Sequence, residues 1–312
     1  MNIRTICVLG GTGFVGTHVV AKLATGGRQV KVITRHVSRH RHLLVVPGVR
    51  LVEADCHDPQ VLRQHFSDCD GVINLVGILN ERGRDGSGFR HAHVDLARKV
   101  IESAREAGIR RLLHMSALNA DAASGPSHYL RTKGEAENIV HTMAGNVRVT
   151  SFRPSVIFGP TDSFFNRFAG LLRLSPVLPL ACPDARFAPV YVGDVAQHFV
   201  DALEDRGTWG QRIELCGPSV YTLKELVSYT AQVMARRRLI LGLSDGLSLW
   251  QARIMEYVPG KPFSLDNYHS MSRDSVCRGG GCCPTAIESI VPGYLGDRER
   301  HARLQRLRSG PR

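Results

Sequence analysis

The stretch that decides the fold is Gly10-Gly11-Thr12-Gly13-Phe14-Val15-Gly16, near the start of a chain of 312 residues. A short apolar segment precedes it over 3–9, and apolar residues follow it at helical spacing over 15–23. The pattern predicts a strand, a tight turn and a helix. Because the glycines at 10, 13 and 16 lack Cβ atoms, the backbone can turn tightly there and approach a pyrophosphate at the helix N-terminus. A preceding strand and a following helix are the context that a phosphate-binding turn of this kind requires.

Strands and helices alternate through the rest of the first half. Further strands are predicted at 29–34, 49–54, 71–76, 111–115 and 147–152, and helices near 59–66, 94–107 and 129–143. This alternation implies right-handed crossovers and an α/β fold, a doubly wound parallel (Rossmann) sheet with ligands at the carboxyl ends of its strands. We therefore predict a nucleotide-binding domain over residues 1–155.

The pattern loosens after Arg153-Pro154, where prolines become frequent. Helices are predicted at 192–203, 223–234 and 247–257. We predict a smaller, interleaved C-terminal substrate or docking region over 156–296, part of which returns to the Rossmann domain. A polar, basic tail follows over 297–312.

Composition and charge limit the classes of function. The longest apolar stretch is broken by Arg173, Pro176 and Pro179, so no transmembrane helix is expected. The first residues lack the apolar core of a signal peptide, and we expect a cytoplasmic location. A formal charge of +12 attracts nucleic acid, anionic lipid and phosphorylated cofactors alike. Nucleic acid is not the expected partner, because no aromatic-basic recognition motif accompanies the charge.

Eight cysteines are scattered through the chain, which favours reduced thiols over a secreted disulfide framework. Cys277, Cys282 and Cys283 are clustered in sequence. Adjacent cysteines seldom chelate one ion together, so we predict loop thiols and no metal site.

The end of the second strand indicates the choice of dinucleotide. A site for NAD(H) usually places Asp or Glu there to accept hydrogen bonds from ribose hydroxyls, but Thr34-Arg35-His36 occupies the position. Arg35 cannot accept such bonds, whereas its guanidinium can hold a 2′-phosphate, with Arg39 and Arg41 nearby. We expect NADP(H) in preference to NAD(H), the alternative being a solvated basic loop. Asp55 is expected to receive the adenine amino group or to cap the next helix.

Three residues suggest proton transfer. Tyr129 and Lys133 are four residues apart in a predicted helix, so both side chains emerge on one face. An ammonium near a phenol stabilises the phenolate and lowers the pKa of the tyrosine toward a range useful for acid or base catalysis. Ser116, at the end of the fifth strand, would hold a substrate oxygen beside Tyr129. Together they predict hydride transfer at a carbonyl carbon, with an amphipathic surface pair as the plain alternative.

In this order, the residues resemble the extended or atypical short-chain dehydrogenase/reductase superfamily (NAD-dependent epimerase/dehydratase-like). Asn74-Leu75-Val76-Gly77 adds to the likeness. Within the superfamily, the sequence is most similar to the nucleotide-binding accessory subunits of respiratory complex I (alpha-subcomplex subunit nine) and their bacterial relatives. The most specific segment is Arg153-Pro154-Ser155-Val156-Ile157-Phe158-Gly159-Pro160, and the likeness extends to about Leu295.

The resemblance implies a bound NADP(H) and an association with ubiquinone metabolism or with the inner face of the respiratory membrane. Ser116, Tyr129 and Lys133 would be the catalytic residues. The residues expected to contact the cofactor are Gly10, Thr12, Gly13, Phe14, Val15, Gly16, Arg35, Asp55, Leu75, Val76, Gly77, Tyr129, Lys133 and Pro154.

Three functions are consistent with these residues. The first is an NADP(H)-dependent oxidoreductase acting on a carbonyl, alcohol or quinone-related substrate. The second is a non-catalytic NADP(H)-binding accessory or assembly subunit of a respiratory NADH:ubiquinone oxidoreductase. The third is a nucleotide-sugar epimerase or dehydratase, because one scaffold supports several reactions. The loops 80–90 and 277–283 depart from the family pattern and leave the substrate open.

Overall fold

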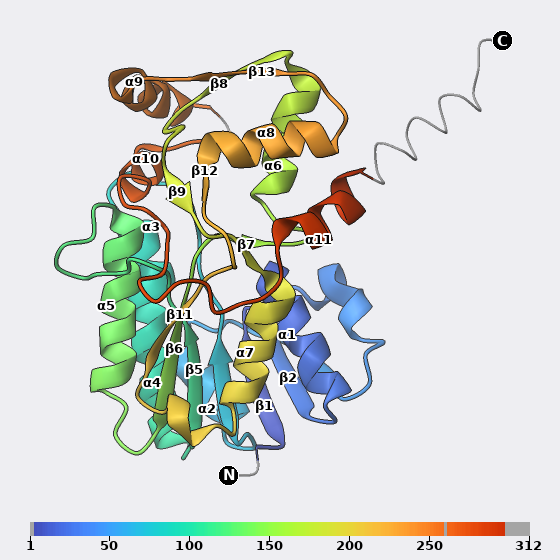
Figure 1. The fold of residues 1–312 in the computed structure, drawn as a ribbon. Coiled ribbons are helices and arrows are strands. Elements are labelled where there is room, and N and C mark those ends of the chain that lie inside the picture. The colour runs from blue at the N-terminus through green and yellow to red at the C-terminus, as the bar shows by residue number, and fades with distance from the viewer. Residues whose placement is uncertain (1–2, 259–260, 297–312) are drawn as a thin grey trace. The chain divides into compact units, whose positions relative to one another are not determined.

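The computed structural model describes residues 3–258 and 261–296 (Figure 1). The chain divides into two compact units. The first unit comprises the residues up to Pro154 together with Gly193–Leu215, and the second comprises Ser155–Val192 and the residues from Cys216 onward. The basic tail predicted for 297–312 lies outside the described residues.

A seven-stranded parallel sheet forms the centre of the first unit, with strand order β11-β6-β5-β4-β1-β2-β3. The doubly wound sheet expected from the alternating pattern is confirmed. The strand order reverses between β1 and β4, which is where ligands bind in such folds. The strands are β1 (Thr5–Leu9), β2 (Gln29–Thr34), β3 (Val49–Glu53), β4 (Gly71–Asn74), β5 (Arg111–Met115), β6 (Arg148–Pro154) and β11 (Arg212–Leu215).

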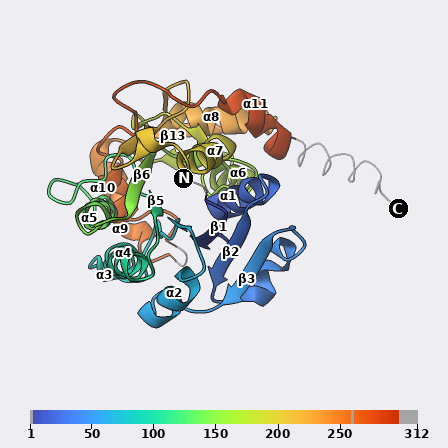
Figure 2. The same ribbon diagram turned by 90° about the horizontal axis from the view of Figure 1, so that it is seen from below.

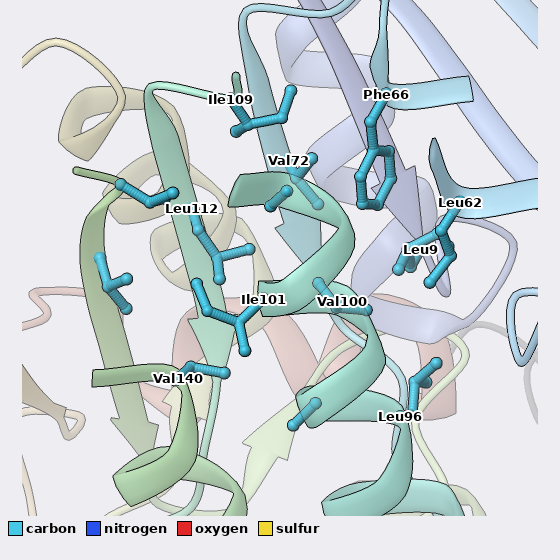
Figure 3. Packing of buried hydrophobic residues seen from close by; sticks show 14 of the residues in the cluster. Leu9, Leu62, Phe66, Val72, Leu96, Val100, Ile101, Ile109, Leu112 and Val140 are labelled. Atoms are coloured by element: carbon cyan, nitrogen blue, oxygen red, sulfur yellow. The ribbon is translucent and has the colours of Figure 1, made fainter. Parts of the chain in front are cut away.

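Helices cover both faces of this sheet (Figure 2). On one face lie α2 (Pro59–Phe66), α4 (Leu96–Glu106) and α5 (His128–Thr142), and on the other lie α1 (Phe14–Thr25) and α7 (Val192–Ala202). Apolar residues of α4 recur at intervals of three and four, so they face the sheet and are buried. Figure 3 shows part of the resulting core, including Phe66, Val100, Leu112 and Val140. Full burial of each such side chain contributes ~1.5–3 kcal/mol.

Arg111 fixes the late part of the first unit to the early strands. Its side chain is fully buried, and its guanidinium donates to the carbonyl oxygens of Arg148 (2.8 Å) and Ala202 (2.7 Å). It also donates to the hydroxyls of Thr150 (2.8 Å) and Thr208 (2.7 Å). Burial lowers the pKa of Arg111 to about 10, so the group remains charged at neutral pH.

The second unit is built from short strand pairs and helices. Its strand pairs are β7 (Ile157–Phe158) with β10 (Val190–Tyr191), β9 (Arg186–Phe187) with β12 (Tyr221–Thr222), and β8 (Val177–Leu180) with β13 (Leu239–Gly242). Its helices are α6 (Phe165–Leu174), α8 (Leu223–Val233), α9 (Asp245–Met255), α10 (Leu265–Ser270) and α11 (Ile287–Val291). Its larger apolar cluster packs Phe158, Phe165 and Ile287 together. No helix among the described residues is both long enough and apolar enough to cross a membrane.

Two features differ from the expectations drawn from sequence. The first is β11, a four-residue edge strand in which charged and apolar residues alternate, too short for its pattern to be distinctive. The second is a disulfide between Cys216 and Cys277, so the prediction of a loop thiol is wrong for Cys277, whereas Cys282 and Cys283 are free thiols. The partners are 61 residues apart, and only the fold brings their Cα atoms to 5.9 Å.

Candidate functional site

The glycine turn between β1 and α1 has no room for side chains at two of its positions. Gly10 adopts φ +73°, and a Cβ there would lie 3.0 Å from the carbonyl carbon of Leu75 and from the amide nitrogen of Val76. A Cβ on Gly16 would lie 2.2 Å from the carbonyl oxygen of Gly10. The turn is therefore packed against the segment that follows β4, and glycine is required at both positions.

Helix α1 begins without a capping side chain. Its N-cap is Gly13, and its first turn, all of which the structure describes, contains no acidic residue. In contrast, Asp58 caps α2 and Ser127 caps α5 through their side-chain oxygens. The first amide N–H groups of α1 and the positive end of its dipole are thus left to a ligand, and they suit a phosphate.

Basic and acidic residues meet beyond the end of β2. Arg35 is exposed directly after the strand, and Arg39 and Arg41 are exposed in the 3-10 segment η1 (Val37–Leu43). Glu53, which the sequence reasoning missed, pairs in register with Thr34 and accepts a hydrogen bond from the Val37 amide at 2.7 Å. Its place beside β2 depends on the pairing of β2 with β3, which spacing along the chain does not reveal.

Asp55 lies two residues after the end of β3 and is exposed. Its Oδ1 accepts a hydrogen bond from the His57 amide at 2.9 Å, which closes a local turn. The cap of α2 is Asp58, whose Oδ1 accepts from the Gln60 amide at 2.8 Å. The capping alternative for Asp55 is therefore wrong.

Lys133 is buried between β5 and the segment after β4. Its Nζ donates to the carbonyl oxygen of Met115 at 3.0 Å, and a Cβ on Gly77 would lie 2.9 Å from the same nitrogen. The side chain is 4% exposed, and burial lowers its pKa to about 8. No carboxylate in the described part of the chain forms an ion pair with it. A buried cation of this kind needs further hydrogen-bond acceptors.

Ser116 and Pro154 lie at the carboxyl ends of neighbouring strands. The Ser116 amide donates to the carbonyl oxygen of Phe152 at 2.8 Å, and the Leu118 amide donates to that of Pro154 at 3.0 Å. The Ser116 hydroxyl is buried and has no hydrogen-bond partner among the described residues. A buried hydroxyl without a hydrogen bond destabilises the fold, and a ligand that binds this hydroxyl would remove that cost.

Tyr129 lies one helical turn before Lys133 on α5 and is half-buried. Its ring meets the ring of His93 edge to face, with centroids 5.6 Å apart. His93 lies in a π-helical segment, η2 (Arg90–Asp95), and its Nε2 accepts a hydrogen bond from the Ile78 amide at 3.2 Å. Nothing in the spacing of the sequence indicated His93, because its position depends on this irregular segment.

A second buried histidine, His114, lies on β5, where a polar residue inside an apolar strand was the available signal. Burial and then the charge of Lys133 lower the pKa of His93 to about 2 and that of His114 to about 3. Both rings are therefore neutral at pH 7, and Lys133 is the local positive charge.

Residues 6–216, which include every residue of this site, match the NAD dependent epimerase/dehydratase family. The chain belongs to that family. Among relatives, subunit 9 of the alpha subcomplex of mitochondrial NADH dehydrogenase (ubiquinone) 1 from Mus musculus is 30% identical over 263 residues, covering 82% of this chain and 68% of the subunit. Ceramide reductase from Caulobacter vibrioides is 29% identical over 240 residues, or 77% and 74% of the two chains.

Solved structures of the family show the same fold. The dTDP-glucose 4,6-dehydratase DesIV from Streptomyces venezuelae, with NAD bound, superimposes with a TM-score of 0.72 at 19% identity, covering 95% of this chain and 96% of DesIV. Family membership supports a nicotinamide nucleotide as the cofactor. It does not distinguish NADP(H) from NAD(H).

Proposed function

We propose that this protein is an NADP(H)-dependent oxidoreductase that acts on a carbonyl or alcohol group. The observation that carries the proposal is the buried Lys133, whose ammonium lies against Gly77 and one helical turn from Tyr129. Burying a cation in such a position costs free energy. A functional role explains the cost, because the ammonium can bind a ribose hydroxyl of the cofactor and stabilise the phenolate of Tyr129.

The residues fit the cofactor at several points. The turn Gly10–Gly16 and the amides of α1 would hold the pyrophosphate, and Leu75, Val76, Gly77 and Pro154 would line the dinucleotide. Asp55 would receive the adenine amino group. Arg35, supported by Arg39 and Arg41, would hold the 2′-phosphate that distinguishes NADP(H) from NAD(H). When bound, the nicotinamide supplies a hydride donor or acceptor.

The chain's own residues would manage the proton. Lys133 would donate a hydrogen bond to the nicotinamide ribose and lower the pKa of Tyr129 through its charge. The Tyr129 hydroxyl would give its proton to the substrate oxygen during reduction and take it back during oxidation. The Ser116 hydroxyl would donate a hydrogen bond to the same oxygen. This bond would give the buried hydroxyl the partner that it lacks among the described residues.

The proposed substrate is an apolar carbonyl compound, either a ketone of a lipid or a quinone-related molecule. The likeness to a ceramide reductase favours a lipid. The likeness to a subunit of a ubiquinone-reducing complex favours the quinone-related class.

The test is to release and identify the nucleotide from purified protein by mass spectrometry, and then to follow NADPH oxidation with long-chain ketones, quinones and nucleotide sugars. We expect NADP(H), with turnover on an apolar carbonyl that Tyr129→Phe abolishes. Tyr221→Phe, in the second unit, is the matched control, because its hydroxyl binds Glu288. Turnover on a nucleotide sugar instead would support the epimerase or dehydratase alternative.

The second candidate is a non-catalytic NADP(H)-binding accessory subunit on the inner face of a respiratory membrane. Similarity to the mouse complex I subunit favours it. Its signature would be retained NADPH that stays reduced across the whole substrate panel, together with co-purification of respiratory subunits. That result would exclude the oxidoreductase proposal.

A further inference from the structure

Helix α9 exposes a stripe of large apolar side chains to solvent. The helix buries Ser248 and Ala252, whereas Leu247, Trp250 and Ile254, spaced three and four apart on the opposite face, are exposed by 53%, 63% and 43%. Just after the helix ends, Tyr257 and Val258 are also exposed, by 73% and 40%. An amphipathic helix on a globular protein normally shows the reverse arrangement.

The strand pair β8–β13 has an outward apolar face of the same kind. Val177 is paired with Leu239, and Pro179 with Leu241, so these four residues share one face. All four are exposed, including Leu239 at 56%, while Leu178 and Leu180 on the alternate positions are buried.

Hydrogen bonds join α9 to this strand pair. Gln251 Nε2 donates to the carbonyl oxygen of Pro179 at 3.2 Å, and the Cys182 amide donates to the Ser248 hydroxyl at 3.1 Å. Figure 1 shows both elements at the same end of the second unit. We call the combined exposed residues the α9 surface: Val177, Pro179, Leu239, Leu241, Leu247, Trp250, Ile254, Tyr257 and Val258. Apolar residues gathered in this number mark an interaction surface, unlike single exposed ones.

Positive charge accompanies the α9 surface. Arg253 is exposed on α9, Arg237 is exposed just before β13, and Arg173 is exposed at the end of α6. Two acidic residues lie at the ends of α9, and both accept hydrogen bonds within the unit, so the three arginines outnumber the two carboxylates. Asp245 accepts from the Tyr268 hydroxyl at 2.6 Å, and Glu256 accepts from the Leu265 amide at 3.3 Å. Tryptophan, tyrosine and aliphatic residues bordered by arginine suit the headgroup region of an anionic lipid leaflet.

We propose that the α9 surface docks this protein onto a membrane leaflet that contains anionic lipid. Trp250, Ile254 and Tyr257 enter the headgroup region, and Arg237 and Arg253 contact lipid phosphates. The docking is peripheral, in keeping with the finding that no described helix can span a bilayer. It does not depend on the proposed oxidoreductase activity, since an accessory subunit would dock in the same way.

Vesicle flotation tests the proposal with the full chain, using phosphatidylcholine vesicles with and without phosphatidylglycerol. We expect binding to the anionic vesicles and about tenfold weaker binding for the double variant Trp250→Ser, Ile254→Ser. The double variant Arg237→Gln, Arg253→Gln should bind about 25-fold more weakly, at about fivefold per arginine. The matched control is Leu44→Ser, Val45→Ser, which removes two exposed apolar residues of the first unit and should not change binding.

Trp250 gives a direct second readout. In a Trp209→Phe background it is the chain's remaining tryptophan, and its emission should shift to shorter wavelength with anionic vesicles and remain unchanged with neutral ones. No flotation of the unmodified protein with anionic vesicles would overturn the proposal. A dimer, detected by light scattering, that the Trp250 and Ile254 substitutions dissociate would in that case identify a second copy of the chain as the occupant of the surface.

Discussion

Replacing Lys133 by methionine should make the apoprotein more stable at neutral pH. Burial lowers the pKa of Lys133 from 10.5 to about 8, and each pKa unit corresponds to ~1.4 kcal/mol. The buried ammonium therefore costs about 3 kcal/mol. Methionine has a similar length and no charge, but it loses the hydrogen bond to the carbonyl oxygen of Met115, which is worth ~1 kcal/mol. The expected net gain in the free energy of unfolding is about 2 kcal/mol.

The pH dependence supplies a sharper test. Below pH 8 both states bind the lysine proton, and the full cost is present. Between pH 8 and 10.5 the unfolded chain keeps the proton that the folded protein has lost, so the stability of the unmodified protein rises with pH. The advantage of the methionine variant should therefore be largest at pH 7 and shrink steadily as the pH approaches 10.

Urea unfolding at pH 7 and pH 9.5, followed by circular dichroism, measures both effects. Lys31→Met is the matched control. Lys31 is also buried, but its Nζ forms an ion pair with Asp68 and donates to the carbonyl oxygen of His65 at 3.0 Å. That variant should be less stable than the unmodified protein, because it leaves those acceptors without their donor. Loss of stability in Lys133→Met at pH 7, or a gain that does not change with pH, would refute the reasoning.

Three further substitutions test the site and its support. Gly16→Ala would place a Cβ 2.2 Å from the Gly10 carbonyl oxygen, so nucleotide binding measured by calorimetry should be lost. Arg35→Ala should weaken NADPH binding about tenfold or more and leave NADH binding unchanged, because a charge-assisted hydrogen bond to phosphate contributes ~1.5–3 kcal/mol. Glu137→Gln should lower the free energy of unfolding by about 2 kcal/mol, because the fully buried carboxylate forms ion pairs with two arginines. The loss is smaller than for a fully buried pair, because both arginines are partly exposed and water can solvate them.

Each of these has a matched control. Gly170→Ala adds a Cβ that meets no atom within 4 Å and should leave nucleotide affinity intact. Arg50→Ala removes another exposed arginine of the first unit, and an equal loss of NADPH affinity there would count against a specific role for Arg35. Glu135→Gln breaks a more exposed ion pair with Arg90 and should change stability by ~0–1 kcal/mol. A Glu137→Gln variant no less stable than Glu135→Gln would contradict the burial argument.

Sequence was sufficient wherever the signal is local. The strand, glycine turn and helix around Gly10 follow from apolar periodicity and missing Cβ atoms, and the alternating pattern gave the parallel sheet. Spacing alone placed Tyr129 and Lys133 on one helix. It could not show that Lys133 is buried against Gly77, since that contact depends on how β4 and β5 pair.

Sequence was insufficient wherever distant segments meet. Glu53 lies beside the end of β2 because of the register between β2 and β3, and Cys216 forms a disulfide with Cys277, 61 residues away in sequence. The α9 surface was also hidden, because an apolar stripe on a helix predicts a buried face, and Trp250 and Ile254 are on the exposed one. In each case the decisive information lies in pairing or packing, which local propensity does not encode.

The buried Arg111 also has a consequence for folding during synthesis on the ribosome. Two of its hydrogen-bond partners, Ala202 and Thr208, are synthesised about ninety residues later than the arginine, a separation of 91 and 97 positions. Until they emerge, the guanidinium has no complete set of acceptors, and β6 has not yet gained its neighbour β11. The first unit therefore completes its folding only after Leu215 has left the exit tunnel, and a nascent chain that stops at Pro154 exposes an unpaired strand edge prone to aggregation.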